Sequence, residues 1–510
     1  MILSILIGLP VLGAVLVGIF PPAKVTKTLS LLVSGTVFVF SLALYAGFDP
    51  ANGGFQFAEQ YSLIPQWGVR YAVGLDGLSL WLILMTTFLT PLILWGSFSS
   101  ITTNIRGFHA SILLMESSVI GTLASTDIFL FYLFWELMLI PAFFLIGVWG
   151  GPNRIKATIK FVLFTMFGSL LMLVALLYIT HEAKTFDYVK LFDHPFPEDV
   201  QFWCFLAFSL AFLIKVPLFP FHAWLPDAYT EAPAGGTVML SSVLVKLGAY
   251  GLLRFCIPLF PEAAKAFAPW IMVLSVAGVL HGALMASIQT DFKRLIAYSS
   301  LSHMGMITLG LFTFSLIGLQ GGVYQMVSHG VYMAGLFLLA GMLYERRGSH
   351  EMEAFGGIAK TAPWLAFTFL WMMLAAVGLP GFNGFVGEWL ILLSAYKSTP
   401  VLALTSIAGF VLAAWYLFNL YGRVFLGPMK EKKNPKFADM SLREILVLLP
   451  LVAAVLWMGL SPNIFLQPTE KTLQMKVIEK LKPPPTMMDF AAQQRRIQEE
   501  VDKDKKWRGQ

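Results

Sequence analysis

Six ionisable residues lie inside long apolar stretches of this sequence. They are Glu136, Lys215, Lys246, His303, His329 and Glu388. A charged side chain at the centre of a membrane helix costs roughly 2.5 to 3.5 kcal/mol on insertion scales, so such residues are rare unless they have a use. Glu, Lys and His side chains share the ability to take up and release a proton. These residue types in these positions therefore indicate proton movement through a membrane.

The six residues are expected at one depth. Glu136 is about eight residues into its apolar segment, which corresponds to about 12 Å at 1.5 Å per helical residue, and Lys246 is about 15 Å into its own. His303 and His329 occupy similar depths in two later segments. Desolvation drives a buried Lys toward its neutral form, whereas a nearby carboxylate stabilises the charged form of that Lys. Moving Glu136 relative to Lys215 could thus load and unload a proton.

Each residue also has a plainer interpretation. A lone His in a membrane helix is more often a packing residue that forms hydrogen bonds, and Glu136 could be a purely structural ion-pair partner of Lys215. The coincidence of all six at one depth favours the proton path. Glu116 is a weaker accessory candidate, as are Asp227 and Glu231, for which a solvated loop position explains the sequence equally well.

Two apolar segments contain helix breakers beside an ionisable residue. Pro217 and Pro220 follow Lys215, while Pro380 and Gly381 precede Glu388. Proline removes an amide donor and clashes with the preceding turn, so each segment should split into half-helices with unpaired backbone groups in mid-membrane. Such interruptions are typical of transport sites.

The composition explains what must position these residues. The chain is 57% hydrophobic and only 13% charged, with a mean hydropathy of +0.73, which excludes an ordinary soluble domain. Apolar segments of roughly 20 residues recur along it, each long enough to cross a bilayer as a helix. We predict an all-α integral membrane protein with about fourteen spans. Their centres are expected near residues 11, 37, 85, 116, 138, 168, 211, 246, 277, 304, 332, 379, 414 and 452.

The two breaks suggest an internal repeat. Spans four to eight and spans nine to thirteen each hold one break in their fourth member, so two five-helix repeats of inverted topology are expected, with broken helices seven and twelve. The predicted units are 1–105 (the first three spans), 106–258 (first repeat), 259–428 (second repeat), 429–467 (last span) and 468–510 (exposed C-terminal tail).

Charge and cysteine usage limit location and cofactors. Seventeen Lys and Arg residues fall in one set of alternate loops and only six, Arg254 among them, in the other set. This bias places the first set in the cytoplasm and both termini on the periplasmic side. This loop bias, rather than nucleic-acid binding, accounts for a pI near 9.1. The two cysteines, Cys204 and Cys256, form no CxxC or Cys/His cluster, and no GxGxxG fingerprint is present. No metal and no cofactor are expected in this chain.

Four motifs resemble a known family. They are Phe134–Glu136, Phe212–Pro233, Lys293–Gly305 and Gly378–Glu388. They look like the signatures of the proton-translocating, antiporter-like subunits of respiratory complex I, the NADH:quinone oxidoreductase, and the resemblance runs from about Tyr71 to Leu460. Chain length and an acidic residue at position 388 resemble the M-type (chain 4 type) branch.

The resemblance implies roles for the six residues. Glu136 and Lys215 would form a modulating ion pair, Lys246 would be the central proton carrier, and His303 and His329 would relay toward Glu388 at the exit. It also implies a bacterial inner membrane and a translocase whose NADH, FMN, iron–sulfur clusters and quinone are held by partner subunits. The neighbouring L-type and N-type membrane subunits and bound lipids are expected partners.

Other members of the superfamily remain alternatives. A cation/proton antiporter subunit of Mrp type would share the same six residues without a redox partner, as would the equivalent subunit of a ferredoxin-linked complex or of a membrane hydrogenase. A passive membrane scaffold would tolerate neutralisation of Lys246.

Overall fold

Helices make up most of the structure. The computed structural model of the chain describes residues 1–19, 22–428 and 437–482. The first half contains α1 (Ile2–Ile19), α2 (Ala23–Ala46), α3 (Leu80–Gly96), α4 (Ile105–Ala124), α5 (Ile128–Leu137), α6 (Leu139–Gly147), α7 (Arg154–Ala183), α8 (Tyr188–Asp193), α9 (Glu198–Lys215), α10 (Trp224–Glu231), α11 (Ala234–Val238), α12 (Lys246–Gly251) and α13 (Ile257–Leu259). The second half contains α14 (Pro261–Ser287), α15 (Phe292–Leu311), α16 (Leu316–Arg347), α17 (Pro363–Val377), α18 (Asn383–Ser398), α19 (Pro400–Tyr421), α20 (Leu442–Leu460), α21 (Asn463–Leu473) and α22 (Glu479–Leu481).

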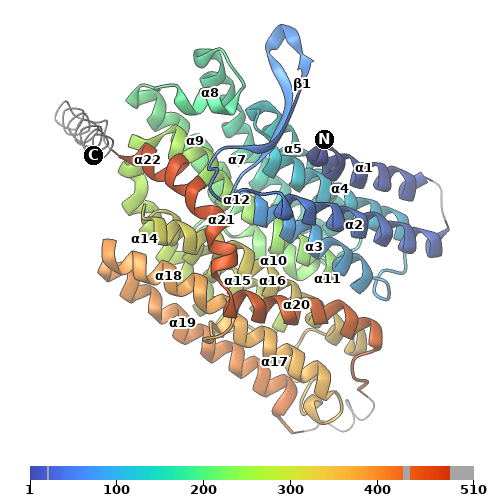
Figure 1. Cartoon of the computed structure of the whole chain (residues 1–510). Helices are drawn as coiled ribbons and strands as arrows, with labels where there is room; N and C mark the ends of the chain where they lie inside the picture. The colour runs from blue at the N-terminus through green and yellow to red at the C-terminus, as the bar shows by residue number, and fades with distance from the viewer. Residues whose placement is uncertain (20–21, 429–436, 483–510) are drawn as a thin grey trace, which may run out of the picture.

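The helices form a membrane bundle (Figure 1). In the described ranges, ten helical segments are long and apolar enough to cross a membrane, and α3 and α17 are shorter apolar helices. The segment 234–259 and α16 are almost wholly buried inside the protein, whereas α2 and α20 bury about a third of their residues and face outward. The predicted multi-span helical membrane fold is confirmed, while the total of fourteen spans and the inverted repeat stay predictions.

Helices end where the breakers stand. Helix α9 ends at Lys215 and α10 begins at Trp224, while α17 ends at Val377 and α18 begins at Asn383. Gly378 and Gly381 have φ angles of +77° and +95°, which L-residues with side chains rarely adopt, so glycine is needed for this second turn. Both interruptions leave an ionisable residue at or near a helix end.

The helix around Lys246 is also irregular. Two π-helical turns, Met239–Leu244 and Leu252–Cys256, flank α12. Wider turns of this kind occur as bulges in helices and are frequent at functional sites.

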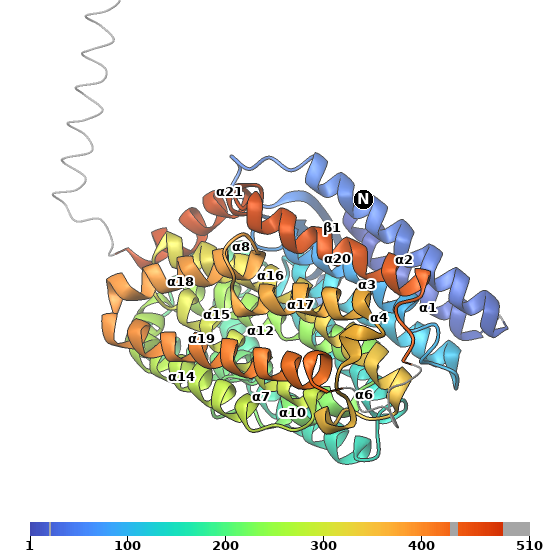
Figure 2. The ribbon, with the colours of Figure 1, turned by 90° about the horizontal axis from the view of Figure 1, so that it is seen from below.

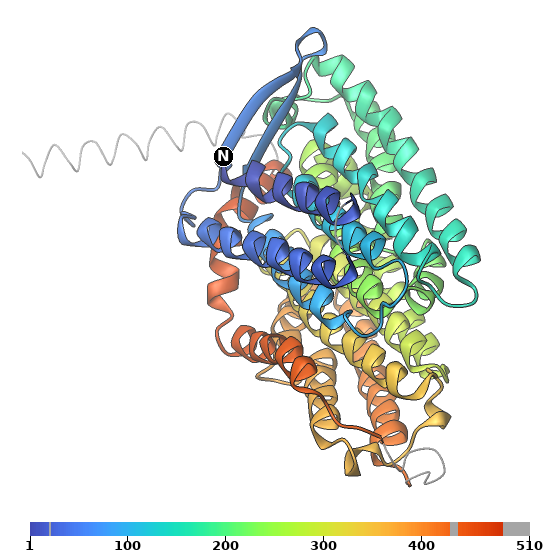
Figure 3. The ribbon, with the colours of Figure 1, turned by 90° about the vertical axis from the view of Figure 1, so that its right-hand side faces the viewer.

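A hairpin that the sequence analysis did not predict projects from one end of the bundle. Strands β1 (Gln56–Ile64) and β2 (Val69–Leu75) pair antiparallel across the 3₁₀ turn Pro65–Trp67. Gly68, with φ +70°, closes that turn. The hairpin extends beyond the ends of α1 and α2, which run side by side (Figure 3).

The expected exposed tail is wrong for residues 468–482. Helix α21, the π-helical turn Gln474–Ile478 and α22 continue from α20 across the ends of other helices (Figure 1). The side chains of Phe465, Leu473 and Val477, which belong to this segment, are buried against the bundle. These apolar residues recur at helical spacing, so they give the segment a face that packs on the bundle. Residues 483–510, with the expected helix-prone stretch, lie outside the described residues.

Candidate functional site

Four of the six sequence-predicted residues form a connected chain of side chains. Lys246 Nζ donates to the Ser241 carbonyl and lies 2.6 Å from His329 Nδ1. The ring centroids of His329 and His303 are 5.6 Å apart. His303 Nδ1 lies 2.9 Å from Glu388 Oε1. Each of the four is at most 3% exposed, so the chain is sealed from the lipid by the surrounding helices. We call Lys246, His329, His303 and Glu388 the relay.

Three helices hold the relay beside α12. Helices α15, α16 and α18 contact one another pairwise and carry His303, His329 and Glu388 respectively. Gly387 permits the close approach of α18 to α16, because a side chain there would collide with Gln325. Glycine at this crossing lets the helix backbones pack tightly, and it brings Glu388 to the polar face of α16.

Two relay partners were missed by the sequence analysis. Gln325 Nε2 donates to Glu388 Oε1 at 3.2 Å and lies 3.3 Å from the Tyr332 hydroxyl. The Tyr332 ring centroid is 5.4 Å from that of His329 and 5.7 Å from that of His303. Gln325, His329 and Tyr332 recur at helical spacing on α16, so a search for polar residues at i, i+4 and i+7 around His329 would have found them.

Several buried polar atoms on α15 and α16 have unused hydrogen-bonding capacity. His303 Nε2 and His329 Nε2 are buried and have no hydrogen-bond partner within the part of the chain that the structure describes, and the same holds for the Ser300 and Ser328 hydroxyls. Buried polar atoms in native proteins are almost always satisfied by protein or by water. Polar groups grouped in this way fit ordered water, which makes about three hydrogen bonds when buried.

Glu136 and Lys215 are not in contact. Across the described ranges, no ion pair within 4 Å joins them, and the Lys215 ammonium instead lies 4.8 Å from the centroid of the Trp135 ring. Lys215 is buried, while Glu136 is half-buried on α5. The two residues of the predicted pair are therefore separated, and the lysine lies on an aromatic ring. Close packing of α12 on the end of α9 is possible because position 248 is glycine, since a side chain there would collide with the Phe212 carbonyl.

The three accessory candidates lie apart from the relay. Glu116 is fully buried on α4. Asp227 forms ion pairs with Lys160 at 2.8 Å and Arg294 at 3.1 Å, which tie α10 to α7 and α15. Glu231 Oε2 accepts a hydrogen bond from the Asn153 amide at 2.9 Å.

A polar cavity opens next to Glu231. It has a volume of about 370 Å³, and Glu231, Asp291, Lys293 and His350 are among the residues that line it. Lys293 Nζ donates to the carbonyls of Thr230 and Ala232. Lys293 is in the first turn of α15, the helix that carries Ser300 and His303, so this cavity is at one end of a polar helix face that leads to the relay.

A second buried charge cluster contains Arg254. The sequence analysis places this residue in a loop, but the structure places it in the buried π-helical turn Leu252–Cys256. Arg254 is 1% exposed and forms two hydrogen bonds of 2.6 Å with Asp76, and Lys476 from the C-terminal segment also reaches Asp76, at 2.9 Å. Burial acts to raise the pKa of Asp76, but Arg254 and Lys476 together lower it well below its ordinary value. This cluster joins the β2 end, the segment 234–259 and the C-terminal segment. Sequence distance hid it, because Asp76 and Lys476 are far apart in the chain.

The fold and the relay define the class as an antiporter-like membrane subunit. The chain is similar to a chain of respiratory complex I from Thermus thermophilus with bound NADH, with a TM-score of 0.87 and 37% identity over 95% of this chain and 100% of that chain. Its fold is also shared by a chain of the Mrp complex from Dietzia, with a TM-score of 0.82 and 21% identity over 94% of this chain and 99% of that one.

Sequence comparison specifies the family. Residues 125–455 match the family described as NADH:quinone oxidoreductase/Mrp antiporter, transmembrane. The chain is 40% identical to the NADH-quinone oxidoreductase subunit M of Rickettsia bellii, over 91% of this chain and 95% of that protein. It is 39% identical to the NADH-ubiquinone oxidoreductase chain 4 of Marchantia polymorpha, over 91% and 94%. The chain belongs to the NADH:quinone oxidoreductase/Mrp antiporter family of membrane subunits.

Proposed function

We propose that this chain is the M-type proton-translocating subunit of an NADH:quinone oxidoreductase and that protons cross it along Lys246, His329, His303 and Glu388. The observation that carries the proposal is the connected, buried series of proton-exchanging groups on four packed helices. The relatives named subunit M and chain 4 support the redox-linked complex over the Mrp antiporter, whose likeness extends to the fold alone.

The ring nitrogens suggest how a proton moves. A charged Lys246 donates to His329 Nδ1, which leaves His329 Nε2 to carry the ring proton. His303 donates from Nδ1 to the Glu388 carboxylate, which leaves His303 Nε2 as an acceptor. A proton that enters His329 at Nδ1 can therefore leave from Nε2, cross by way of water to His303 Nε2, and leave His303 Nδ1 toward Glu388. After one passage, His329 carries its proton on Nδ1 and His303 carries its proton on Nε2. Both rings must therefore return to their starting tautomers before the next proton can pass.

The uptake side is assigned to the polar cavity beside Lys293. That cavity lies among loops with many basic residues, which the sequence analysis assigned to the cytoplasm. Protons from this cavity would enter the relay at Lys246, its first member. The periplasmic outlet would then be at Glu388, whose second carboxylate oxygen lies against the break at Gly378.

The separation of Glu136 and Lys215 fits an ion pair that modulates proton affinity, seen in the arrangement in which the carboxylate has not approached the lysine. A carboxylate that approaches a buried lysine changes the proton affinity of that lysine by about 1 to 3 pKa units, which is about 1.4 to 4 kcal/mol. This compares with about 2.3 kcal/mol for one charge moved through 100 mV. Movement of α5 relative to α9 could therefore load or unload the relay.

The rest of the complex would supply the driving reaction. NADH, FMN, iron–sulfur clusters and quinone are assigned to partner subunits, with L-type and N-type membrane subunits as the neighbours of this chain. The expected location is a bacterial inner membrane, with both termini on the periplasmic side.

Substitution of Glu388 tests the proposed outlet. Glu388→Asp keeps a carboxyl group that can bind and release a proton, and it should retain much of the proton pumping. Glu388→Gln keeps the shape but cannot carry a proton, and pumping should fall on the order of 100-fold, the lower end of what a positioned acid or base contributes. The measurement is NADH-driven acid uptake by inverted vesicles, with Glu262→Gln on the exposed start of α14 as the control. Equal pumping by the Asp and Gln variants would remove Glu388 from the path.

A further inference from the structure

The three relay helices continue past Glu388 to a group of hydroxyls at one end of the bundle. Helices α15, α16 and α18 pack against one another along this stretch (Figure 2). Near their ends, Ser394 Oγ donates to Thr313 Oγ1 at 2.8 Å and lies within hydrogen-bonding distance of Ser315 Oγ. We call Thr313, Ser315 and Ser394 the hydroxyl cluster. Ser394 is buried, whereas Thr313 and Ser315 are half-buried, so the cluster borders the surface of the protein.

The hydroxyl cluster lies across the bundle from the proposed uptake side. Lys293, beside the polar cavity, is in the first turn of α15, and Thr313 follows the last turn of that helix. At the Thr313 end, Gln320 of α16 donates to the carbonyl of Leu466 in the C-terminal segment at 3.3 Å. The cluster is therefore at the end of the relay helices where the C-terminal segment packs.

One large side chain separates Glu388 from the hydroxyl cluster. Glu388, Ile391 and Ser394 follow one another on α18 at intervals of three residues, and Ile391 is fully buried. The neighbouring helices present glycine to it. A side chain at Gly310 of α15 would collide with the Ile391 side chain, and one at Gly321 of α16 would meet the Ile391 backbone nitrogen at 3.0 Å. Ile391 is thus enclosed by helix backbones that carry no side chain at the contact.

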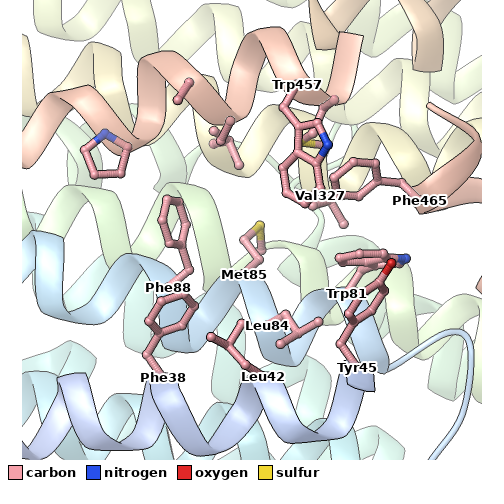
Figure 4. A pocket seen from close by; sticks show the side chains of 15 residues that line it. Phe38, Leu42, Tyr45, Trp81, Leu84, Met85, Phe88, Val327, Trp457 and Phe465 are labelled. Carbon is pink, nitrogen blue, oxygen red and sulfur yellow. The ribbon is translucent and has the colours of Figure 1, made fainter. Parts of the chain in front are cut away.

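The two sides of α16 differ in polarity at this level. Toward α3 and α20, Val327 and Val331 line an apolar groove of about 420 Å³ (Figure 4), and apolar cavities of this kind stay dry. Toward α18, Gln325 is fully buried, and its Oε1 has no hydrogen-bond partner among the residues that the structure describes. A side chain at Gly387 would collide with this oxygen, so an unused acceptor stands one turn before Ile391 on the side that leads to the hydroxyl cluster.

We propose that Ile391 is a hydrophobic gate on the exit side of the relay, and that the hydroxyl cluster receives the protons that pass it. The inference rests on the proposed function, because Glu388 must deliver the proton. Glu388 and Ser394 are about 9 Å apart along the axis of α18 at 1.5 Å per residue, so water must bridge them. The packed isoleucine keeps water out. When its side chain moves, the space beside the two glycines can fill with water, and hydrophobic constrictions open and close by such wetting and drying.

A structural interpretation explains the same contacts without a gate. Ser315 accepts a hydrogen bond from the Gly318 amide at 3.1 Å and so caps α16, and glycines let membrane helices approach closely. On this interpretation, substitutions alter the amount of assembled complex and leave its proton permeability unchanged. A gate predicts that the permeability itself changes.

Passive proton leak tests the gate. Liposomes that contain the whole complex receive a pH step without NADH, and a trapped dye reports how fast the step decays. Ile391→Ala removes three carbon atoms, and the part of the decay due to the complex should become about 50-fold faster, which corresponds to the cost of wetting those carbons. Ile407→Ala on the exposed face of α19 is the matched control and should leak like the parent. An Ile391→Ala complex as tight as the parent would overturn the gate.

A double variant shows whether the leak follows the relay. Glu388→Gln combined with Ile391→Ala should restore the slow decay, because protons can then no longer reach the widened gate from Glu388. A leak that persists in the double variant would come from a general loss of packing and would also overturn the proposal.

The hydroxyl cluster has its own pair of variants, which answers the question if Ile391→Ala does not assemble. Ser394→Thr keeps the hydroxyl, whereas Ser394→Val replaces it by a methyl group in a side chain of the same shape. NADH-driven pumping per assembled complex should be retained by the Thr variant and be about fivefold lower in the Val variant, the contribution of one typical hydrogen bond. Ser406→Val, at a fully buried serine of α19, is the control and should pump like the parent. Equal pumping by the two Ser394 variants would contradict the role of the cluster.

The outcome for Glu388 separates this inference from the proposed function. Normal pumping by Glu388→Gln would remove Glu388 from the path and would contradict the proposed function itself. Impaired pumping by Glu388→Gln, together with a tight Ile391→Ala complex and equal pumping by the Ser394 variants, would contradict the exit route alone.

Discussion

Replacement of Lys246 by arginine separates a proton carrier from a structural cation. Lys246 is 1% exposed and has two partners, the Ser241 carbonyl and His329 Nδ1. Arginine keeps the positive charge and the capacity to donate to both. Its ordinary pKa is above 12, against about 10.4 for lysine, so release of a proton to His329 becomes harder by at least about two pKa units, or about 3 kcal/mol. Proton pumping should therefore fall about 100-fold or more.

The assay compares three variants. NADH-driven acid uptake into inverted vesicles is measured for Lys246→Arg, Lys246→Ala and the control Lys265→Arg, which alters an exposed lysine paired with Glu262. Each value is normalised to the amount of assembled complex. A carrier predicts that the Arg and Ala variants are both impaired, whereas a structural cation predicts that arginine is tolerated far better than alanine. If Lys246→Arg pumps like the parent, the reasoning is refuted and the proton must bypass Lys246 through water.

Three further predictions concern the side of the bundle on which the sequence analysis places both termini. Asp76→Asn leaves Arg254 buried without its counterion, which should destabilise the chain by about 3 to 5 kcal/mol; a lower melting temperature and yield of the complex would be measured, and normal values would contradict a structural role. Burial lowers the pKa of Lys476 to about 8, with Asp76 opposing and Arg254 adding to this shift. The undocked segment binds more protons between pH 8 and about 10.4, so docking should strengthen as pH rises through that window; deuterium exchange of residues 463–482, corrected for intrinsic rates, should show this in the parent and not in Lys476→Met. A reporter fused at Gln510 should behave as exported, and cytoplasmic behaviour would mean that a span was miscounted.

The relay could be predicted from sequence because its members are conspicuous in their own segments. Lys246, His303, His329 and Glu388 are ionisable residues in apolar stretches, and helical rise alone places them at similar depth. The family assignment, made from four motifs, is confirmed by the match over residues 125–455. The roles of the individual residues stay predictions.

The parts that were missed depend on contacts between distant segments. Arg254 was counted as a loop residue because Asp76, which stabilises it in a buried helix, is far away in sequence. Residues 468–482 were predicted as an exposed tail because their hydropathy is low, although the apolar residues of this packed segment share one face. The hairpin at β1 and β2 is too short to stand out beside membrane helices. Hydropathy averages report what lies in lipid and are insensitive to such pairings.

The geometry at Lys246 also suggests why the relay has a direction. The π-helical turn Met239–Leu244 lies just before α12, and the Lys246 side chain folds back to reach the Ser241 carbonyl in that turn. Its ammonium then faces two acceptors, a backbone carbonyl that cannot take a proton and the His329 ring nitrogen that can. Only transfer to His329 leads onward, and His329 belongs to the second predicted repeat while Lys246 belongs to the first. In the proposed relay, a proton on Lys246 would therefore stand at the junction between the two predicted repeats. Its release would depend on the tautomer of His329 on one side and, in the proposed modulation, on Lys215 and Glu136 on the other.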